Sequence, residues 1–169
     1  DQVTIRTGYN RAVRSPQIGT MFAPQNLGLW PGTDPCAGDT PTYTAAQCAL
    51  TGVTAGQYGN IVASPASQYN SVSGGNQELD PEVADTISFG IVARPMDNLT
   101  ISVDYWSIEL EDAIGSIGEA TIIEQCAENG TQSLCNLINR GSSGTLWLGT
   151  TGYVKSTTSN LGEVNFSGV

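Results

Sequence analysis

The sequence predicts an all-β protein built from antiparallel strands. Apolar and small polar residues alternate in two neighbouring segments, 84–94 and 99–110, and a period of two is typical of β-strands. The apolar residues of this pattern are Ile87, Phe89, Ile91, Ile101, Val103 and Tyr105. Residues 95–98 make a short turn, which indicates an antiparallel hairpin. Each strand has one apolar and one polar face, as in a soluble β-sandwich or the wall of a transmembrane β-barrel.

Two further regions complete the predicted strands. Residues 2–14 alternate in the same way and end before Pro16, because proline cannot donate a hydrogen bond to a strand ladder. Residues 145–169 also carry strand-like sequence. The chain opens in the middle of a strand pattern, so we expect a mature product or a piece of a larger protein.

A long segment, residues 16–80, lacks sustained periodicity and holds six of the eight prolines. Its spaced aromatic residues and its cysteines favour an ordered loop with a small core of its own over disorder. Loops of this length are usually functional. Four aromatic residues of this segment and Trp147 beyond it are candidate ligand contacts, although we prefer a role in the loops' own core for them: Trp30, Tyr43, Tyr58, Tyr69 and Trp147.

A small helical insert is predicted in residues 115–144. Ser116 and Glu119 match the S-x-x-E capping box that begins a helix, and Gly130 suits its end. Thr131 then caps a second short helix that ends at Gly141. Apolar residues recur on one side of each helix, at Ile122, Ile123 and Cys126 and at Leu134, Leu137 and Ile138.

The four cysteines form two close pairs, Cys36 with Cys48 and Cys126 with Cys135. Four cysteines allow three pairings, of which the local one is the simplest because each bridge then closes one loop. Disulfides indicate an oxidising compartment such as the periplasm, the cell surface or the extracellular space. No C-x-x-C pair and no histidine is present, so a zinc site is not expected.

Charge and composition exclude several functions. Six Lys and Arg residues stand against sixteen Asp and Glu, a net charge of −10, which argues against a nucleic-acid partner and an anionic membrane surface. Without histidine the Ser-His-Asp triad is missing, and no carboxylate pair stands out for glycoside chemistry. We therefore predict no enzyme activity, no catalytic residue, no cofactor and no metal. A run of about 18 apolar residues, as a transmembrane helix needs, does not occur.

Three aspartates require an environment that suits their charge. Asp34 and Asp39 flank Cys36 and offer oxygen ligands for calcium, but no calcium-loop pattern surrounds them, so we prefer a solvated loop. Asp104 lies on the polar face of a strand. Because a buried charge is costly in apolar surroundings, we expect water or a hydrogen-bonding partner there.

Four stretches of the sequence resemble TonB-dependent outer-membrane receptors. Residues 9–16 are similar to the family's Y-x-R-A-x-R-x-P segment, and residues 75–86 to its G-N-x-x-L-x-P-E-x-A-x-T segment. Residues 99–114 are similar to its L-x-x-S-x-D-Y strand, and residues 160–169 carry its N-x-G and G-V pairs. The stretches follow the order found in the family and together cover about half of the chain.

The resemblance implies a portion of a transmembrane β-barrel of about 22 strands with an internal plug. Such a receptor imports a scarce nutrient, for example a siderophore or a saccharide, across the bacterial outer membrane. Residues 16–80 and 115–144 are then extracellular loops, and the turn at 95–98 is periplasmic. The chain shows no plug and no TonB box, and its four or five wall strands are fewer than the ~8 of a closed barrel. Its partners would be the remaining barrel strands and plug, the TonB complex and outer-membrane lipid.

Two alternatives stay open. A barrel portion alone has two unpaired strand edges, which template the addition of strands from other copies. The second hypothesis is therefore a self-assembling extracellular fibre or structural subunit. The third is a secreted β-sandwich lectin that binds sugar through the loop aromatics. Detergent dependence favours the receptor, and filaments without detergent favour the fibre.

Overall fold

The computed structural model describes residues 3–169, which divide into two compact units. The wall unit consists of the chain up to Gln17, Glu78–Gly115 and Ser159–Val169. The loop unit consists of Ile18–Gln77 and Ser116–Thr158. Gln2, which we predicted to begin the first strand, lies outside the described residues. No helix within residues 3–169 is long and apolar enough to cross a membrane.

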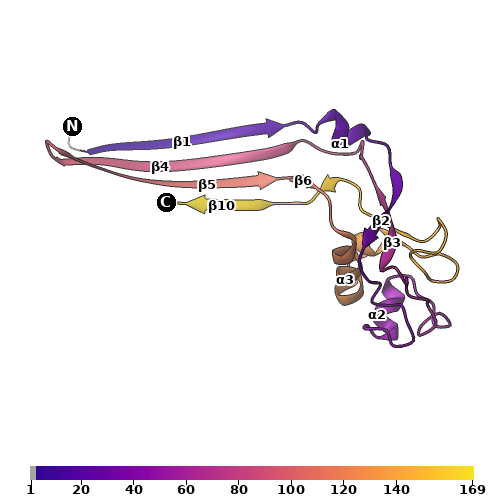
Figure 1. Ribbon diagram of the computed structural model, residues 1–169. Helices are drawn as coiled ribbons and strands as arrows, with labels where there is room; N and C mark the ends of the chain where they lie inside the picture. Colours follow the sequence, from indigo (N-terminus) through magenta and orange to yellow (C-terminus); the bar gives the residue numbers. More distant parts are fainter. Residues whose placement is uncertain (1–2) are drawn as a thin grey trace. The chain divides into compact units, whose positions relative to one another are not determined.

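The wall unit is built on a four-stranded antiparallel sheet (Figure 1). Its strands in spatial order are β1 (Val3–Arg14), β4 (Glu82–Met96), β5 (Leu99–Glu111) and β10 (Val164–Gly168). Strands β4 and β5 form the predicted hairpin, with a shift of register between Ala93 and Met96 next to the turn. A short second ladder pairs β6 (Ile114–Gly115) with β9 (Ser159–Asn160). Strands β1 and β10 form the two edges of the four-stranded sheet.

The predicted strand region 145–169 is too broad. Turns and bends occupy most of residues 141–152, and strand structure is confined to β8 (Tyr153–Lys155), β9 and β10. Gly149 has a φ of 75° and Gly162 a φ of 98°, both in the left-handed region that interrupts an extended strand. These two glycines explain why the alternation does not produce one continuous strand.

One face of the wall sheet is apolar over four successive rows. Ile5, Ile91 and Val103 lie side by side in one row, and the neighbouring rows are Val3, Ala93 and Ile101; Thr7, Phe89 and Tyr105; and Tyr9, Ile87 and Ser107. The large apolar side chains of these rows are all at least 39% exposed. Four rows two residues apart span about 20 Å along the strands. The next row, Arg11, Asp85 and Glu109, is charged and ends the apolar band.

The opposite face carries a central ion pair. The guanidinium of Arg6 donates two hydrogen bonds to Asp104, from Nε to Oδ1 at 2.9 Å and from Nη2 to Oδ2 at 2.6 Å. Gly90 lies between these two residues in the same row. A Cβ at Gly90 would lie 2.1 Å from Asp104 Oδ1, so the missing side chain makes room for the pair. The hydrogen-bonding partner expected for Asp104 is therefore Arg6.

The loop unit has a smaller sheet of its own. Its strands run in the order β2 (Asn26–Pro31), β3 (Gln68–Ser73), β8 and β7 (Ile138–Asn139). The pair of β3 with β8 is parallel, whereas the other two pairs are antiparallel. The parallel pair is an exception to the predicted antiparallel arrangement, and it joins the two segments of the unit, which lie far apart in the sequence.

Four short helices accompany this sheet: α1 (Ile18–Phe22), α2 (Ala45–Leu50), α3 (Glu119–Asn129) and α4 (Gln132–Cys135). Gly130 ends α3 with a φ of 62°, as predicted. The predicted capping box is wrong, because Gly118 and not Ser116 has the extended N-cap conformation and no side chain caps α3. Thr131 precedes α4 without a side-chain hydrogen bond. Helix α4 ends at Cys135 and β7 follows, so Gly141 is not its end.

Two buried clusters and two disulfides hold the loop unit together. The first cluster contains Trp30, Tyr69, Ile122, Ile123, Leu146 and Val154. The second contains the disulfide Cys36–Cys48 with Val53 and Ile61. The disulfide Cys126–Cys135 joins α3 to α4. The cysteines therefore have the local pairing, and the long segment 16–80 is ordered around a core of its own.

Candidate ligand pockets

The five candidate aromatic residues separate into two groups. Trp30 and Tyr69 are buried in the first cluster with their ring centroids 5.6 Å apart, and Trp147 packs against the same cluster. The indole N–H of Trp147 donates to the carbonyl of Val62 at 2.9 Å. Tyr43 and Tyr58 pack against the second cluster, where the Tyr58 hydroxyl donates to the Tyr43 carbonyl at 2.9 Å. Most of the aromatic area thus contributes to the core of the loop unit.

Trp30 and Tyr43 nevertheless line one pocket, which we call the loop pocket. Its volume is about 310 Å³. Three segments form it: the end of β2 with the following residues up to Pro35, the pair Thr42 and Tyr43, and one face of α3. Helix α3 contributes Ala120, Ile123 and Glu124, which face the same side because they are three and four residues apart. The pocket therefore combines aromatic, apolar and carboxylate groups.

The polar groups of the loop pocket are mainly hydrogen-bond acceptors. The hydroxyl of Tyr43 donates to Oε1 of Glu128 at 2.9 Å. This hydrogen bond, followed by partial burial and by the negative charges of Glu128 and Glu124, raises the pKa of Tyr43 above its usual range. The lining contains no lysine or arginine. The Glu124 carboxylate is exposed and forms no ion pair within the part of the chain that the structure describes.

The indole of Trp30 has one polar atom without a partner. Its Nε1–H is buried and donates to no group among residues 3–169. A Cβ at Gly32 would lie 2.0 Å from Cζ3 of this indole, so Gly32, which also lines the pocket, packs against the six-membered ring. The N–H is at the other end of the indole. Because this N–H is buried, it is not accessible to a ligand in the loop pocket.

A buried ion pair lies next to the pocket lining. Arg140 donates to both carboxylate oxygens of Asp34, from Nη1 at 2.6 Å and from Nη2 at 3.0 Å. Only 3% of the Arg140 side chain and none of the Asp34 side chain is exposed. Arg140 also donates to the carbonyls of Thr51 at 3.1 Å and Gly144 at 2.9 Å. The pair fixes Asp34 between Thr33 and Pro35, which both line the pocket.

These contacts correct the predictions for Asp34. Its Oδ1 also accepts a hydrogen bond from the backbone N–H of Cys36 at 3.1 Å. Both oxygens are therefore occupied by groups of the protein, which contradicts the alternative of a calcium ligand. The preferred prediction of a solvated residue is also wrong, because Asp34 is buried, whereas Asp39 is exposed as expected.

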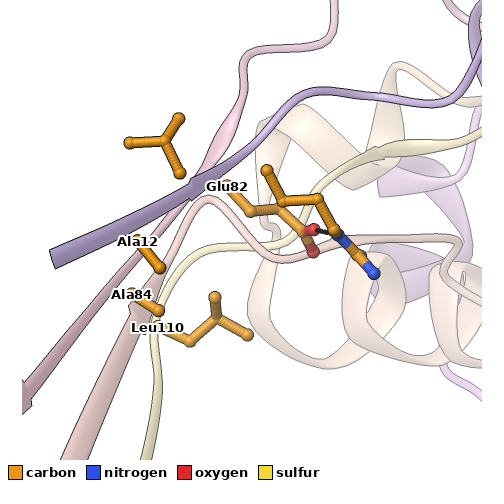
Figure 2. Close-up of a pocket in the computed structure, with 6 residues that line it drawn as sticks. Ala12, Glu82, Ala84 and Leu110 are labelled. Atoms are coloured by element: carbon orange, nitrogen blue, oxygen red, sulfur yellow. Dashed lines mark hydrogen bonds and ion pairs between the residues drawn. The ribbon is translucent and has the colours of Figure 1, made fainter. Parts of the chain in front are cut away.

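A second pocket, the wall pocket, lies at one end of the wall sheet (Figure 2). Its volume is about 310 Å³. Figure 2 shows Ala12, Ala84 and Leu110 along it, and these three residues form one row across β1, β4 and β5. Val13 and the ion pair of Arg14 with Glu82 complete the lining. Glu82 is buried and also accepts a hydrogen bond from the N–H of Ile114 at 2.9 Å. Its charge is thus already satisfied within the protein.

The charged residues of the two pockets and the buried ion pair beside one of them carry little signal in the sequence. Glu124 carries a weak signal, since it lies one residue after two buried isoleucines on a predicted helix. Arg140 carries none, because its partner Asp34 is distant in the sequence. The Arg14 and Glu82 positions fall within two of the four motifs noted above. That they form an ion pair at the wall pocket becomes visible only from the pairing of β1 with β4, which places Arg14 opposite Glu82.

Comparison with known proteins gives one family and one solved structure. The family described as "TonB dependent receptor-like, beta-barrel" matches residues 1–169. The crystal structure of the siderophore receptor PirA from Pseudomonas aeruginosa is similar with a TM-score of 0.48 and 17% sequence identity. That similarity covers 99% of this chain and 21% of the PirA chain. No curated protein matches the sequence. The fibre hypothesis gains no support from these comparisons.

Proposed function

Because the chain belongs to the TonB-dependent receptor family of β-barrels, we propose that it forms part of the wall and surface loops of a nutrient-uptake receptor. The receptor would capture a scarce nutrient and import it across the bacterial outer membrane. Proteins of this family are transport receptors and not enzymes. The observation that carries the proposal is the continuous apolar face of the wall sheet, with the family match over the whole chain.

The chemistry of the wall sheet supports this proposal. The four apolar rows span about 20 Å along the strands, which at a strand tilt of about 35–45° covers roughly 15 Å of the ~25 Å apolar band of outer-membrane barrels. At the end of the band, the phenol of Tyr9 donates to Oδ1 of Asp85 at 2.6 Å, and Arg11 lies 3.8 Å from the same carboxylate. Aromatic residues followed by charged ones are typical of the membrane interface. The opposite face, with Arg6 and Asp104, suits a water-filled lumen.

We infer further parts of the proposed receptor from the family and the strand order. Strands β1 and β10 would each pair with a neighbouring strand of the parent barrel. The turn between β4 and β5 would be periplasmic, and residues 16–80 and 115–144 would be extracellular loops. The plug and the TonB complex would act through the parent receptor. A siderophore and a saccharide both remain candidate nutrients.

The test uses the full-length protein in its bacterium. We expect it in the outer-membrane fraction and soluble only in detergent. Deletion of its gene should abolish uptake of radioactive iron from a hydroxamate siderophore or of a labelled maltodextrin, and deletion of tonB should have the same effect. Recovery of the protein as filaments in detergent-free buffer would favour the fibre. Recovery as a soluble monomer that binds maltodextrin would favour the lectin.

A further inference from the structure

We propose that the loop pocket binds a small organic cation, a ligand that carries a protonated amine next to an apolar group. The inference rests on the proposed receptor function only where it assigns this cation as cargo. The binding itself is a property of the loop unit.

The size and the walls favour a small ligand with an apolar part. About 310 Å³ is near the lower limit of typical ligand pockets, which begin at roughly 300 Å³. Trp30, Tyr43 and Ile123 offer aromatic and aliphatic surface, and Pro31 and Pro35 extend it. Aromatic rings also attract cations through the negative potential of their faces. The walls therefore suit an apolar group and an ammonium equally well.

The charge of the site decides between ligand types. Glu124 lines the pocket, and Glu128 lies one helical turn further along α3 and accepts the hydrogen bond of Tyr43. The loop unit contains two basic residues, Arg140 and Lys155, against five acidic ones: Asp34, Asp39, Glu119, Glu124 and Glu128. Arg140 is buried against Asp34 and does not line the pocket. An anionic ligand would meet uncompensated negative charge, whereas a cation would neutralise Glu124.

The hydrogen-bonding groups lead to the same conclusion. The Tyr43 hydroxyl already donates its hydrogen bond to Glu128, so its oxygen is left as an acceptor. The Glu124 carboxylate only accepts hydrogen bonds. The hydroxyls of Thr33 and Thr42 are the side-chain donors of the lining. A pocket with this excess of acceptors suits a ligand rich in donors, and an ammonium group brings three N–H donors with its charge.

The experiment measures binding of benzylamine to the full-length receptor in detergent by titration calorimetry at physiological salt. Benzyl alcohol and benzoate have nearly the same shape and are neutral and anionic, so they serve as matched ligands. We expect benzylamine to bind at least about tenfold more tightly than either, as one charge-assisted hydrogen bond allows. Maltose is included as a probe for a saccharide site.

Two isosteric variants separate the pocket from the general field of the loop unit. Glu124→Gln should weaken benzylamine binding about tenfold, because it removes the charge and leaves the side chain's shape. Asp39→Asn removes the same charge at an exposed residue outside the lining and should leave the affinity unchanged. Tyr43→Phe keeps the ring and removes one acceptor, so a smaller loss is expected. Hydrogen exchange of α3 confirms that each variant is folded.

Several results would overturn the inference. The inference is wrong if benzylamine binding is undetectable or if benzyl alcohol binds equally tightly. It is also wrong if maltose binds tightly and Glu124→Gln does not change its affinity. Equal weakening by Asp39→Asn would show that binding follows the overall charge. The uptake test stands apart from these results. TonB-dependent uptake without benzylamine binding contradicts only the cation site, and benzylamine binding without TonB-dependent uptake contradicts only the receptor proposal.

Discussion

At the scale of single residues, breaking the buried pair of Arg140 and Asp34 should strongly destabilise the loop unit. The charges of the pair are removed from water, and Arg140 also bonds two carbonyl groups. Breaking a buried pair leaves one charge without compensation, which costs about 3–5 kcal/mol. An exposed pair contributes only about 0–1 kcal/mol. We therefore expect the loss of a buried pair and the loss of an exposed pair to lower the free energy of unfolding by different amounts.

We expect Arg140→Met to lower the free energy of local unfolding around the second cluster by about 3–5 kcal/mol. Hydrogen exchange at the amides of Cys36 and Thr51 would measure it, because the Cys36 N–H donates to Asp34 and the Thr51 carbonyl accepts from Arg140. The control is Arg11→Met, which removes a half-exposed partner of Asp85 and should cost under about 1 kcal/mol. If the two substitutions lowered the free energy of unfolding equally, the Arg140–Asp34 pair would not have the larger contribution that its burial predicts.

The role of a residue could be predicted from sequence where the pattern within a single strand determines it. The polar environment of Asp104 follows from the alternation of β5, and a hydrogen-bonding partner was expected there. The role of Gly90 was not foreseen, because the atoms that need its space belong to Arg6 and Asp104 on the two neighbouring strands. Asp34 was misassigned for the same reason, since its partner is Arg140.

At the scale of elements, the disulfide Cys126–Cys135 supports the shortest helix in the loop unit. Helix α4 has four residues, none of them buried, and isolated helices of this length are unstable in water. Helix α3 buries four residues, including Ile122 and Ile123, and ends at Gly130. The two helices should therefore depend on the disulfide to different degrees.

Replacing both Cys126 and Cys135 by alanine should lower the stability of the loop unit by about 2–4 kcal/mol. We expect α4 to lose hydrogen-exchange protection first, while α3 keeps most of its own because of its buried side. The matched control replaces Cys36 and Cys48 by alanine, which should affect α2 and leave α4 protected. Loss of protection to the same extent in α3 and α4 would show that the two helices unfold as one element.

Elements with an uninterrupted pattern were predicted well. The hairpin of β4 and β5 differs from its predicted bounds by at most two residues at either end. Strands β2 and β3 were missed because each has six residues and no clear alternation. Helix α2 had a readable signal, since Thr44 and Gln47 form a capping box in the structure. The parallel pairing of β3 with β8 depends on two distant segments meeting and leaves no local signature.

At the scale of the whole molecule, the two faces of the wall sheet should respond differently to charge. Ile91 and Val92 are neighbours in β4 and point to opposite faces. In the proposed barrel Ile91 faces lipid, so Ile91→Arg should cost about 2–4 kcal/mol. Val92→Arg places the same charge toward the lumen and should cost clearly less. The measurement is urea-induced unfolding of the full-length receptor refolded into lipid vesicles.

The comparison of these variants also tests the orientation of the sheet. A larger cost for Val92→Arg would mean that the apolar rows do not face lipid. Equal and small costs would mean that neither face meets a membrane, which would leave the fibre and the lectin as hypotheses.

The family could be predicted from sequence because its four motifs lie on strands and at their ends, where local spacing is fixed. The loop pocket could not be predicted. It needs residues 30–43 to meet helix α3, which begins only at Glu119 and is far from them in the chain. Their meeting depends on the two buried clusters and not on any local pattern.

The parallel ladder between β3 and β8 also constrains the order in which parts of the loop unit fold. Ser71 pairs with Val154 and Val72 with Lys155, so the small sheet cannot be completed until the chain has been synthesised as far as Lys155. Contacts between residues this distant form slowly, because the intervening chain must be brought together first. The disulfide Cys36–Cys48 closes a short loop and can form early. We therefore expect the Cys36–Cys48 bridge to be in place before the parallel ladder of the loop unit forms.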